Sequence, residues 1–187
     1  MEHYPTSADI DEMKARGYDR ATIDTAKKRM ERGKVAMPIC EQIRLAFAGV
    51  VLGNGVGLRQ ARGLDYYEDE ETCARFRLED EKEDWARISS DSLNVYNSSL
   101  SFFDAEGMRF HLPAYLIADL RGEYGFGMDF DLTHLSDHKE EKFSLLSVAQ
   151  RGAVREYLRF ILEEPDYEFG RPHIERALAG FWSEGCD

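Results

Sequence analysis

Apolar residues recur at helical spacing just after the first fifth of the chain. Ile39, Ile43, Phe47 and Val50 follow one another at intervals of four, four and three residues, so they share one face of a helix. Pro38 stands immediately before them, and proline suits the first turn of a helix because its missing N–H is not needed there. The pattern therefore predicts an amphipathic helix that starts at Pro38.

A second amphipathic helix is predicted over residues 147–162. It opens with Ser147 and Gln150, which have the spacing of a capping box, in which each side chain bonds the backbone N–H of the other residue. One face of this helix is apolar and carries Val154, Tyr157, Leu158, Ile161 and Leu162. A last helix is predicted over residues 172–181.

Two shorter and more polar helices are predicted near the N-terminus. Ser7 and Asp19 are suitable N-cap residues, and Gly33 is a suitable end for the second helix. Because neither helix has a strong apolar face, we expect residues 1–37 to form a helical hairpin appended to a main domain of residues 38–187.

A β-hairpin is predicted over residues 100–112. Residues 100–103 have high β propensity, and residues 104–107 read as a turn in which Gly107 supplies a positive φ. Residues 108–112 then alternate between apolar and polar side chains, as a half-buried strand does. Together with the helices, this predicts an α+β fold: a mostly helical single domain with a small antiparallel sheet.

The charge balance restricts the partners that this chain can bind. Its 187 residues include 24 basic and 36 acidic side chains, which gives a net charge of −12. Residues 65–84 are the most acidic stretch, with ten acids against Arg75, Arg77 and Lys82. Nucleic acids and anionic membranes attract clustered Lys and Arg, so we expect neither as a partner. A basic protein fits this charge better.

The end of the acidic stretch holds the residues that we expect to bind such a partner. Glu79, Asp80, Glu83 and Asp84 precede Trp85. If Trp85 is exposed, it is an aromatic hot spot surrounded by acids. The alternative is that Trp85 anchors the core and the carboxylates form the solvated face of a helix. Asp80 and Asp84, one helical turn apart, would also suit acid–base work or a metal.

Arg109 and His111 form a second candidate binding site. On a strand, side chains two residues apart point to the same face, so the predicted hairpin would place both beside the turn at Asp104. They would then either line a small polar site or form a cross-strand pair.

Residues 129–138 are a weak candidate for a metal site. Two of the histidines are four residues apart, as on one helix face, but Ser136 and Asp137 resemble a helix cap that would separate them. The chain has no HExxH motif, and the alternative is a solvated loop. The potential ligands are Asp129, Asp131, His134, Asp137 and His138.

The glycine-rich residues 53–57 resemble a phosphate-binding loop only in composition. The lysine followed by serine or threonine that such a loop needs is missing, and a predicted helix precedes the glycines where a dinucleotide fingerprint needs a strand. We interpret the segment as the end of one helix and the start of the next.

The remaining signals concern the compartment and cofactors. The N-terminus lacks the basic and apolar regions of a secretory signal, and no apolar run has the length of a membrane span. The three cysteines form no CxxC motif, which disfavours a disulfide framework or a structural zinc site. We therefore expect a cytoplasmic protein with reduced thiols, no bound cofactor and no membrane partner.

One part of the sequence resembles a known family. Residues 101–116, SFFDAEGMRFHLPAYL, resemble the core motif of a family of uncharacterised bacterial proteins, a domain of unknown function. Residues 80–85, 58–61 and 143–147 are similar to its flanking segments, and the resemblance spans about residues 38–182. It implies a bacterial protein with one domain, and it carries over no catalytic residue.

Two functions remain open from the sequence. The first is a non-catalytic acidic binding protein that engages a basic protein partner, as immunity proteins and antitoxins do; opposite charge would accelerate the encounter. The alternative is a metal-assisted hydrolase that uses residues 129–138. The first needs only the charge pattern, whereas the second needs a ligand geometry that the sequence does not secure. The oligomeric state stays open.

Overall fold

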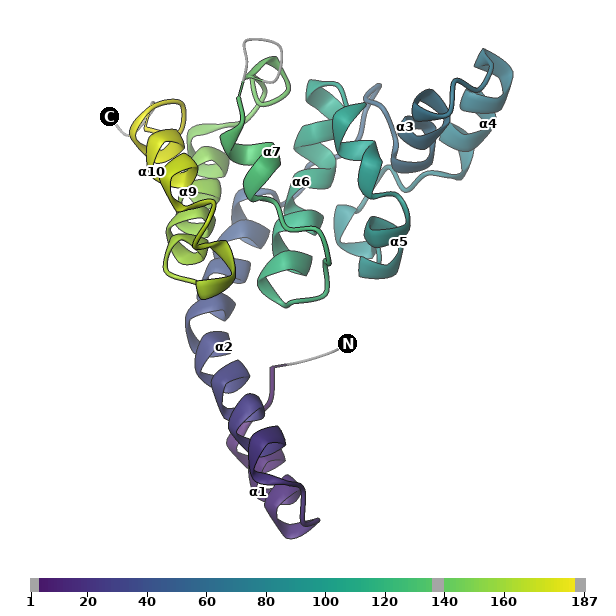
Figure 1. The fold of residues 1–187 in the computed structure, drawn as a ribbon. Coiled ribbons are helices and arrows are strands. Elements are labelled where there is room, and N and C mark those ends of the chain that lie inside the picture. The colour runs from purple at the N-terminus through teal and green to yellow at the C-terminus, as the bar shows by residue number, and fades with distance from the viewer. Residues whose placement is uncertain (1–3, 136–139, 184–187) are drawn as a thin grey trace.

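The computed structural model describes residues 4–135 and 140–183, and every regular element in these residues is a helix. Figure 1 shows a body of packed helices from which one long helix extends. The α-helices are α1 (Ser7–Ala15), α2 (Arg20–Ala46), α3 (Leu58–Asp65), α4 (Glu70–Glu79), α5 (Ser90–Val95), α6 (Ala105–Leu120), α7 (Asp129–Thr133), α9 (Val148–Leu162) and α10 (Arg171–Ala179). The 3₁₀ helices are η1 (Trp85–Arg87), η2 (Asn97–Ser101) and η3 (Pro165–Tyr167).

The predicted α+β fold is wrong, because the predicted hairpin at residues 100–112 is helical and the described residues contain no strand. The predicted turn is the start of α6: Asp104 is its N-cap and accepts a hydrogen bond from the N–H of Gly107 at 2.8 Å. Apolar and polar residues alternate over 108–112, and this pattern led to the wrong prediction of a strand because α6 is buried on nearly every side. A helix that is apolar all round has no helical period to read.

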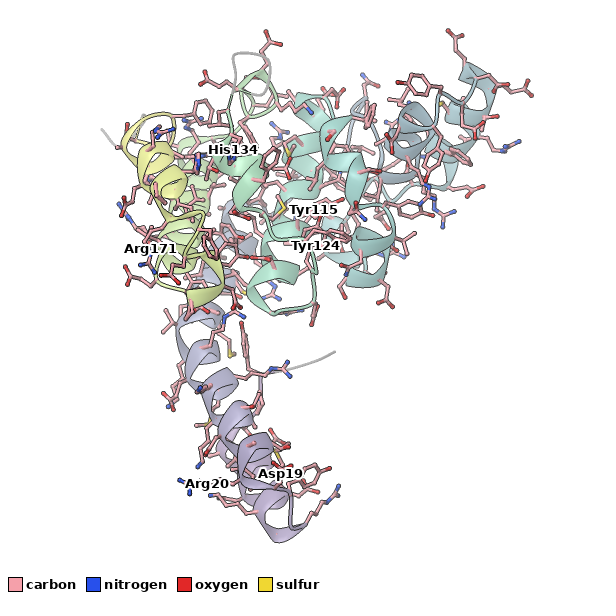
Figure 2. All side chains as sticks on the ribbon, in the orientation of Figure 1. Asp19, Arg20, Tyr115, Tyr124, His134 and Arg171 are labelled. Atoms are coloured by element: carbon pink, nitrogen blue, oxygen red, sulfur yellow. The ribbon has the colours of Figure 1, made fainter. Side chains whose placement is uncertain are left out.

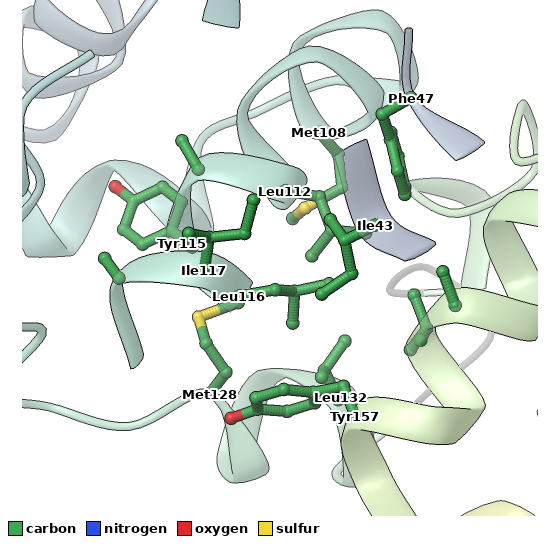
Figure 3. Packing of buried hydrophobic residues seen from close by; sticks show 14 of the residues in the cluster. Ile43, Phe47, Met108, Leu112, Tyr115, Leu116, Ile117, Met128, Leu132 and Tyr157 are labelled. Carbon is green, nitrogen blue, oxygen red and sulfur yellow. The ribbon is translucent and has the colours of Figure 1, made fainter. Parts of the chain in front are cut away.

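Helix α6 is the centre of the body and packs against α2, η1, α5 and α9. Its Leu112 and Leu116 have no exposed surface. Figure 3 shows side chains that meet α6 from α2 and its C-cap, from α7 and from α9: Ile43, Phe47, Leu132 and Tyr157. Burial on all sides fixes both ends of α6, so residues near either end are held in place by the core.

Helix α2 is continuous through the point where two helices were predicted. The expected helix end at Gly33 and the expected start at Pro38 are wrong, since both residues lie inside α2. Gly33 is buried there because Tyr4 packs on it, and a Cβ at this position would lie 2.5 Å from Cγ of Tyr4. The boundary between the predicted segments 1–37 and 38–187 therefore falls within a single helix.

The first half of α2 and the antiparallel α1 form an arm that projects from the body (Figure 1). The predicted N-cap Asp19 is confirmed and accepts the N–H of Thr22 at 3.0 Å, near the far end of the arm (Figure 2). The cap of α1 is Thr6, one residue before the predicted Ser7. No helix of the described residues combines the length and apolar character that crossing a membrane requires.

The glycine-rich residues 53–57 lie where the chain passes closest to the start of α6. A Cβ on Gly55 would lie 2.5 Å from the backbone nitrogen of Gly107, and a Cβ on Gly107 would lie 2.5 Å from the carbonyl oxygen of Val56. Gly57 is the N-cap of α3, so a helix does start here as predicted. The glycines therefore permit a contact between two backbones.

Helices α7, α9 and α10 form one side of the body. The predicted capping box of α9 is confirmed: the N–H of Gln150 donates to Ser147 Oγ at 3.2 Å, and the N–H of Ser147 donates to Gln150 Oε1 at 3.0 Å. Trp182 is fully buried, and its indole N–H donates to the carbonyl oxygen of Leu132 at 2.8 Å. This bond fastens the end of the described chain to the region of α7.

Candidate functional site

The acidic stretch of residues 65–84 contains helix α4, which packs against α3 at the opposite end of the body from α9 and α10 (Figure 1). Asp69 is the N-cap of α4 and accepts the N–H of Thr72 at 2.7 Å, which lowers the pKa of its carboxyl. Glu70 and Glu71 occupy the first turn, where the helix dipole favours carboxylates. A charged helix is therefore present, but it ends at Glu79, so the prediction that Asp80 and Asp84 lie one helical turn apart is wrong.

Two of the expected binding residues hold α4 and its C-terminal end against α3. Glu79 forms an ion pair with Arg59 at 2.5 Å. Asp80 is half-buried and accepts the backbone N–H groups of Arg59 at 2.7 Å and Gln60 at 3.2 Å, at the start of α3. Burial raises the pKa of Asp80, while these two hydrogen bonds act in the opposite direction. Both carboxylates therefore have partners within the chain.

The next expected residues divide between the core and the surface. Trp85 is 7% exposed, and its indole N–H donates to the carbonyl oxygen of Phe47 at 2.9 Å, so it is a core anchor. Asp84 caps η1 by accepting the N–H of Ala86 at 3.0 Å. Glu83 is exposed, and within residues 4–135 and 140–183 no basic side chain pairs with it. Glu79 and Asp84 are exposed as well, but Glu83 is the one carboxylate of this set whose side chain has no bonding partner among the described residues.

A more continuous acidic surface lies at the turn between α3 and α4. We call residues 66–71 the acidic edge, because Tyr66 and Tyr67 are followed there by four carboxylates in a row. All six side chains are exposed, Tyr67 to 95% and Tyr66 to 61%. In the part of the chain that the structure describes, none of these carboxylates forms an ion pair. The acids are Glu68, Asp69, Glu70 and Glu71.

Tyr67 occupies a backbone position that normally belongs to glycine. Its φ is 55°, in the left-handed region. The N–H of Glu68 bonds the carbonyl of Gly63 at 3.0 Å, and the N–H of Tyr67 bonds that of Leu64 at 3.2 Å, which is the Schellman ending of a helix. A left-handed residue other than glycine costs about 1–2 kcal/mol. At 95% exposure, packing does not offset this cost.

A cavity of about 450 Å³ opens beside the acidic edge and shares Tyr66 and Glu68 with it. The guanidinium carbon of Arg62 lies 4.8 Å from the ring centre of Tyr66 and 5.4 Å from that of Tyr96. Arg62 also donates to the carbonyl oxygen of Val95 at 3.1 Å, which fixes its position. The cavity is therefore lined by aromatic rings and by the guanidinium of Arg62, which a hydrogen bond keeps in position.

Arg109 and His111 do not share a face, because they lie on α6 instead of a strand. Successive side chains on an α-helix are rotated by about 100° around its axis. Two side chains that are two residues apart are therefore separated by about 200° and point away from each other. His111 is 1% exposed, donates from Nδ1 to the carbonyl oxygen of Gly107 at 2.7 Å, and stacks on Phe103 with ring centres 4.3 Å apart. Arg109 is half-buried.

The structure does bring His111 together with Glu79 and Asp80. The three residues line one small cavity of about 160 Å³, whereas Arg109 and Trp85 do not line it. Burial lowers the pKa of His111 to about 4, so the ring is neutral at physiological pH. A neutral ring stacked on an aromatic residue suits packing of the core.

The candidate metal segment is only partly described. Asp129 begins α7, and the ring of His134 stacks between Phe130 and His173, with ring centres 4.4 and 4.5 Å away. Figure 2 shows His134 at the junction of α7 and α10. Among the described residues, which include Asp131, no group of three or more potential ligands suits a metal. Asp137 and His138 lie outside the described residues.

A buried carboxylate that we did not predict lies at the C-terminal end of α6. Asp119 is 5% exposed, and Tyr157 donates to its Oδ2 at 2.5 Å. Tyr167 donates to both of its oxygens, at 2.9 and 3.1 Å. Burial raises the pKa of Asp119, against the effect of the two phenol hydrogen bonds. The cluster joins α6, α9 and η3.

The sequence contained a signal for this cluster. Asp119 is the single charged residue in the apolar run of residues 114–120, and a charge within a buried helix needs hydrogen-bonding partners. Tyr157 was assigned to the apolar face of its helix, although a buried phenol also needs a partner for its O–H. If Asp119 had been paired with Tyr157 as acceptor and donor, the sequence would have predicted the contact between α6 and α9.

A comparison with protein families finds a match over most of this chain. Residues 36–186 match the model described as Family of unknown function (DUF6714). The chain belongs to this family. Neither the curated proteins nor the solved structures contain a match to it. The matched region begins within α2, so the family region takes in the whole body, and most of the arm precedes it.

Proposed function

We propose that this member of the family is a bacterial, cytoplasmic, non-catalytic protein that binds a basic protein through its acidic edge. Its action would be that of an immunity protein or antitoxin, which covers a cationic partner. The exposed side chains of residues 66–71 support this function, since two tyrosines flanked by four carboxylates suit a positively charged surface.

Tyr67 is the observation that carries the proposal. It is a large aromatic side chain in a left-handed position, where it costs the fold stability and is almost fully exposed. Strained residues that give the fold no contact point to a role outside the fold. Tyrosine is also among the residues that contribute most to protein interfaces, because it buries a large area with few rotatable bonds.

The distribution of charge supports the same conclusion. Residues 36–187 contain 29 acidic and 16 basic side chains, so the family region carries the whole negative surplus. Such a field accelerates the approach of a basic partner and weakens as salt is added. We do not propose the metal-assisted hydrolase, because Asp129, Asp131 and His134 belong to no group of three or more ligands that could hold a metal within the described residues.

Neutralising the acidic edge tests the proposal. The variant Glu68→Gln, Glu70→Gln, Glu71→Gln removes three charges, keeps the side-chain size and leaves the N-cap Asp69 in place. The partner to use is the purified basic protein encoded next to this gene. We expect the Kd, measured calorimetrically at two salt concentrations, to rise at least tenfold at the lower salt.

A matched variant separates local contact from overall charge. Glu163, Glu168 and Glu175 are exposed and far from α4, and the change of all three to glutamine alters the net charge equally. We expect this control to change the Kd less than threefold. Equal effects of the two triple variants, or the absence of binding by any basic neighbour, would contradict the proposed function.

The exchange Tyr67→Gly is expected to move stability and binding in opposite directions. Glycine relieves the left-handed strain, so the free energy of unfolding should rise by about 0.5–1 kcal/mol after allowance for the greater entropy of unfolded glycine. The loss of the exposed ring should weaken partner binding at least tenfold. Urea unfolding and calorimetry measure the two effects, and a variant that binds as tightly as the parent chain would refute the role of Tyr67.

A further inference from the structure

Another cavity, of about 380 Å³, lies at the other end of α6 from the glycine contact. It is enclosed by the end of α6, the loop of residues 122–127, the start of α7, and η3, and Arg32 of α2 completes its wall. None of these elements belongs to the acidic edge. The inference drawn from this cavity therefore does not depend on the proposed function.

Two carboxylates line this cavity and form no ion pair within the part of the chain that the structure describes. Asp119 is 95% buried, and among the described residues only the phenols of Tyr157 and Tyr167 donate hydrogen bonds to it. Asp129 is half-buried, and within residues 4–135 and 140–183 its carboxylate has neither a hydrogen bond nor an ion pair. Buried carboxylates in proteins are normally paired with a positive charge. Here no basic side chain of the described residues forms an ion pair with either carboxylate.

Arg32 lowers the pKa of Asp119 through its charge, but its ion pair is with Glu164 and not with Asp119. Its Nε lies 3.2 Å from Oε2 of Glu164 and has no hydrogen-bond partner, so the contact is an ion pair without a hydrogen bond. The guanidinium of Arg32 also lies over the ring of Phe160, at 5.4 Å. Because Glu164 neutralises Arg32, Asp119, Asp129 and the exposed Asp166 leave the cavity negative.

The walls of the cavity suit an organic cation. Tyr124, Phe126, Tyr167 and Phe169 contribute aromatic rings, and the ring of Phe169 is 97% exposed at the rim. Aromatic faces attract ammonium and guanidinium groups through their quadrupole. Gly170 keeps the space beside Asp129 open, since a Cβ there would lie 3.0 Å from Oδ2 of that carboxylate.

We propose that this cavity binds an organic cation, a guanidinium or primary ammonium group, between the carboxylates of Asp119 and Asp129 and the surrounding aromatic rings. The cation is the missing partner of the two carboxylates. It comes either from a free amine or from an arginine or lysine side chain on a protein, and the two sources share the same recognition chemistry.

A titration followed by ¹⁵N NMR tests this proposal on the whole chain. The ligands are agmatine as the free amine, and the peptides acetyl-Gly-Arg-Gly-amide, acetyl-Gly-Lys-Gly-amide and acetyl-Gly-Glu-Gly-amide. We expect the cationic ligands to cause saturable shifts of the backbone amides of Gly122, Gly125, Gly127 and Gly170. The glutamate peptide should cause none.

Two substitutions on the cavity wall and one beside it sharpen the test. Asp129→Asn removes a charge without a change of shape and should raise the Kd of agmatine at least tenfold. Asp166→Asn, at an exposed position, should raise it two- to fivefold and serves if the first variant fails to fold. Glu168→Gln removes an equal charge two residues away, outside the cavity lining, and should change the Kd less than twofold.

The outcomes distinguish a free amine from a protein side chain as the source of the cation, and they show whether the proposal fails. Shifts with agmatine alone assign the cavity to a free amine, whereas equal or stronger shifts with the arginine or lysine peptide assign it to a protein side chain. If no cationic ligand shifts the four glycines, or if Glu168→Gln weakens binding as much as Asp129→Asn, the cavity is not a cation site. Binding of a basic protein at the acidic edge would be unaffected by that result.

Discussion

Replacing Trp85 with alanine is expected to lower the free energy of unfolding by about 3–5 kcal/mol. The side chain is 7% exposed, belongs to the main hydrophobic core, and lies on η1, which packs against α6. Truncation leaves a cavity, and the carbonyl oxygen of Phe47 loses the indole hydrogen bond. Urea unfolding followed by circular dichroism measures the change.

Tyr67→Ala is the matched control for Trp85→Ala. It also removes a large aromatic ring, but from a side chain that is 95% exposed, so its effect on the free energy of unfolding should stay within about 0.5 kcal/mol. The pair distinguishes the core anchor from the binding residue. If Trp85→Ala unfolds at the same urea concentration as the parent chain, the assignment of Trp85 to the core is refuted.

The same exchange, glycine to alanine, is expected to have opposite signs at two helical positions. Gly107→Ala should lower the free energy of unfolding by about 1–3 kcal/mol, because its Cβ would lie 2.5 Å from the carbonyl oxygen of Val56, a backbone atom that cannot move alone. Gly152→Ala in α9 should raise it by about 0.5–1 kcal/mol, since the nearest atom to its Cβ is the tip of Arg155 at 3.9 Å.

Both glycine variants are measured by thermal and urea unfolding under identical conditions. Helix propensity alone would make both substitutions stabilising, so the sign at Gly107 reports the contact between the two backbones. A stabilising effect of Gly107→Ala would show that the loop of residues 53–57 can move away from α6.

Local signals in the sequence predicted two helix caps correctly, but they divided α2 at Gly33 and Pro38 and gave the wrong fold class. The caps at Asp19 and Ser147 were identified correctly, because a cap depends on residues within one turn of each other. The central helix α6 was taken for a hairpin, because Asp104 and Gly107 suit a helix start and a turn equally. Only the packing around α6 decides between the two, and a local pattern does not contain that information.

The candidate sites could be predicted from the sequence only in part, because tertiary contacts decide which charged side chains are used inside the fold. The charge of the stretch of residues 65–84 is a property of composition, so it was visible at once. Which carboxylates would be used inside the fold depends on the contact between α3 and α4, and Asp80 was therefore taken for a surface group. The cluster around Asp119 draws on α6, α9 and η3, which are distant in the sequence.

The path of α2 has a consequence for a variant of this chain shortened to the family region. A chain that started at residue 36 would place Pro38 in the opening turn of this helix, where proline is well tolerated, so the body could dispense with the arm. It would also lack Arg32 and Tyr4, whose hydroxyl donates to the carbonyl oxygen of Leu120. The Asp119 cavity would then lose one wall and its only basic lining residue among the described positions, and would become wider and more acidic.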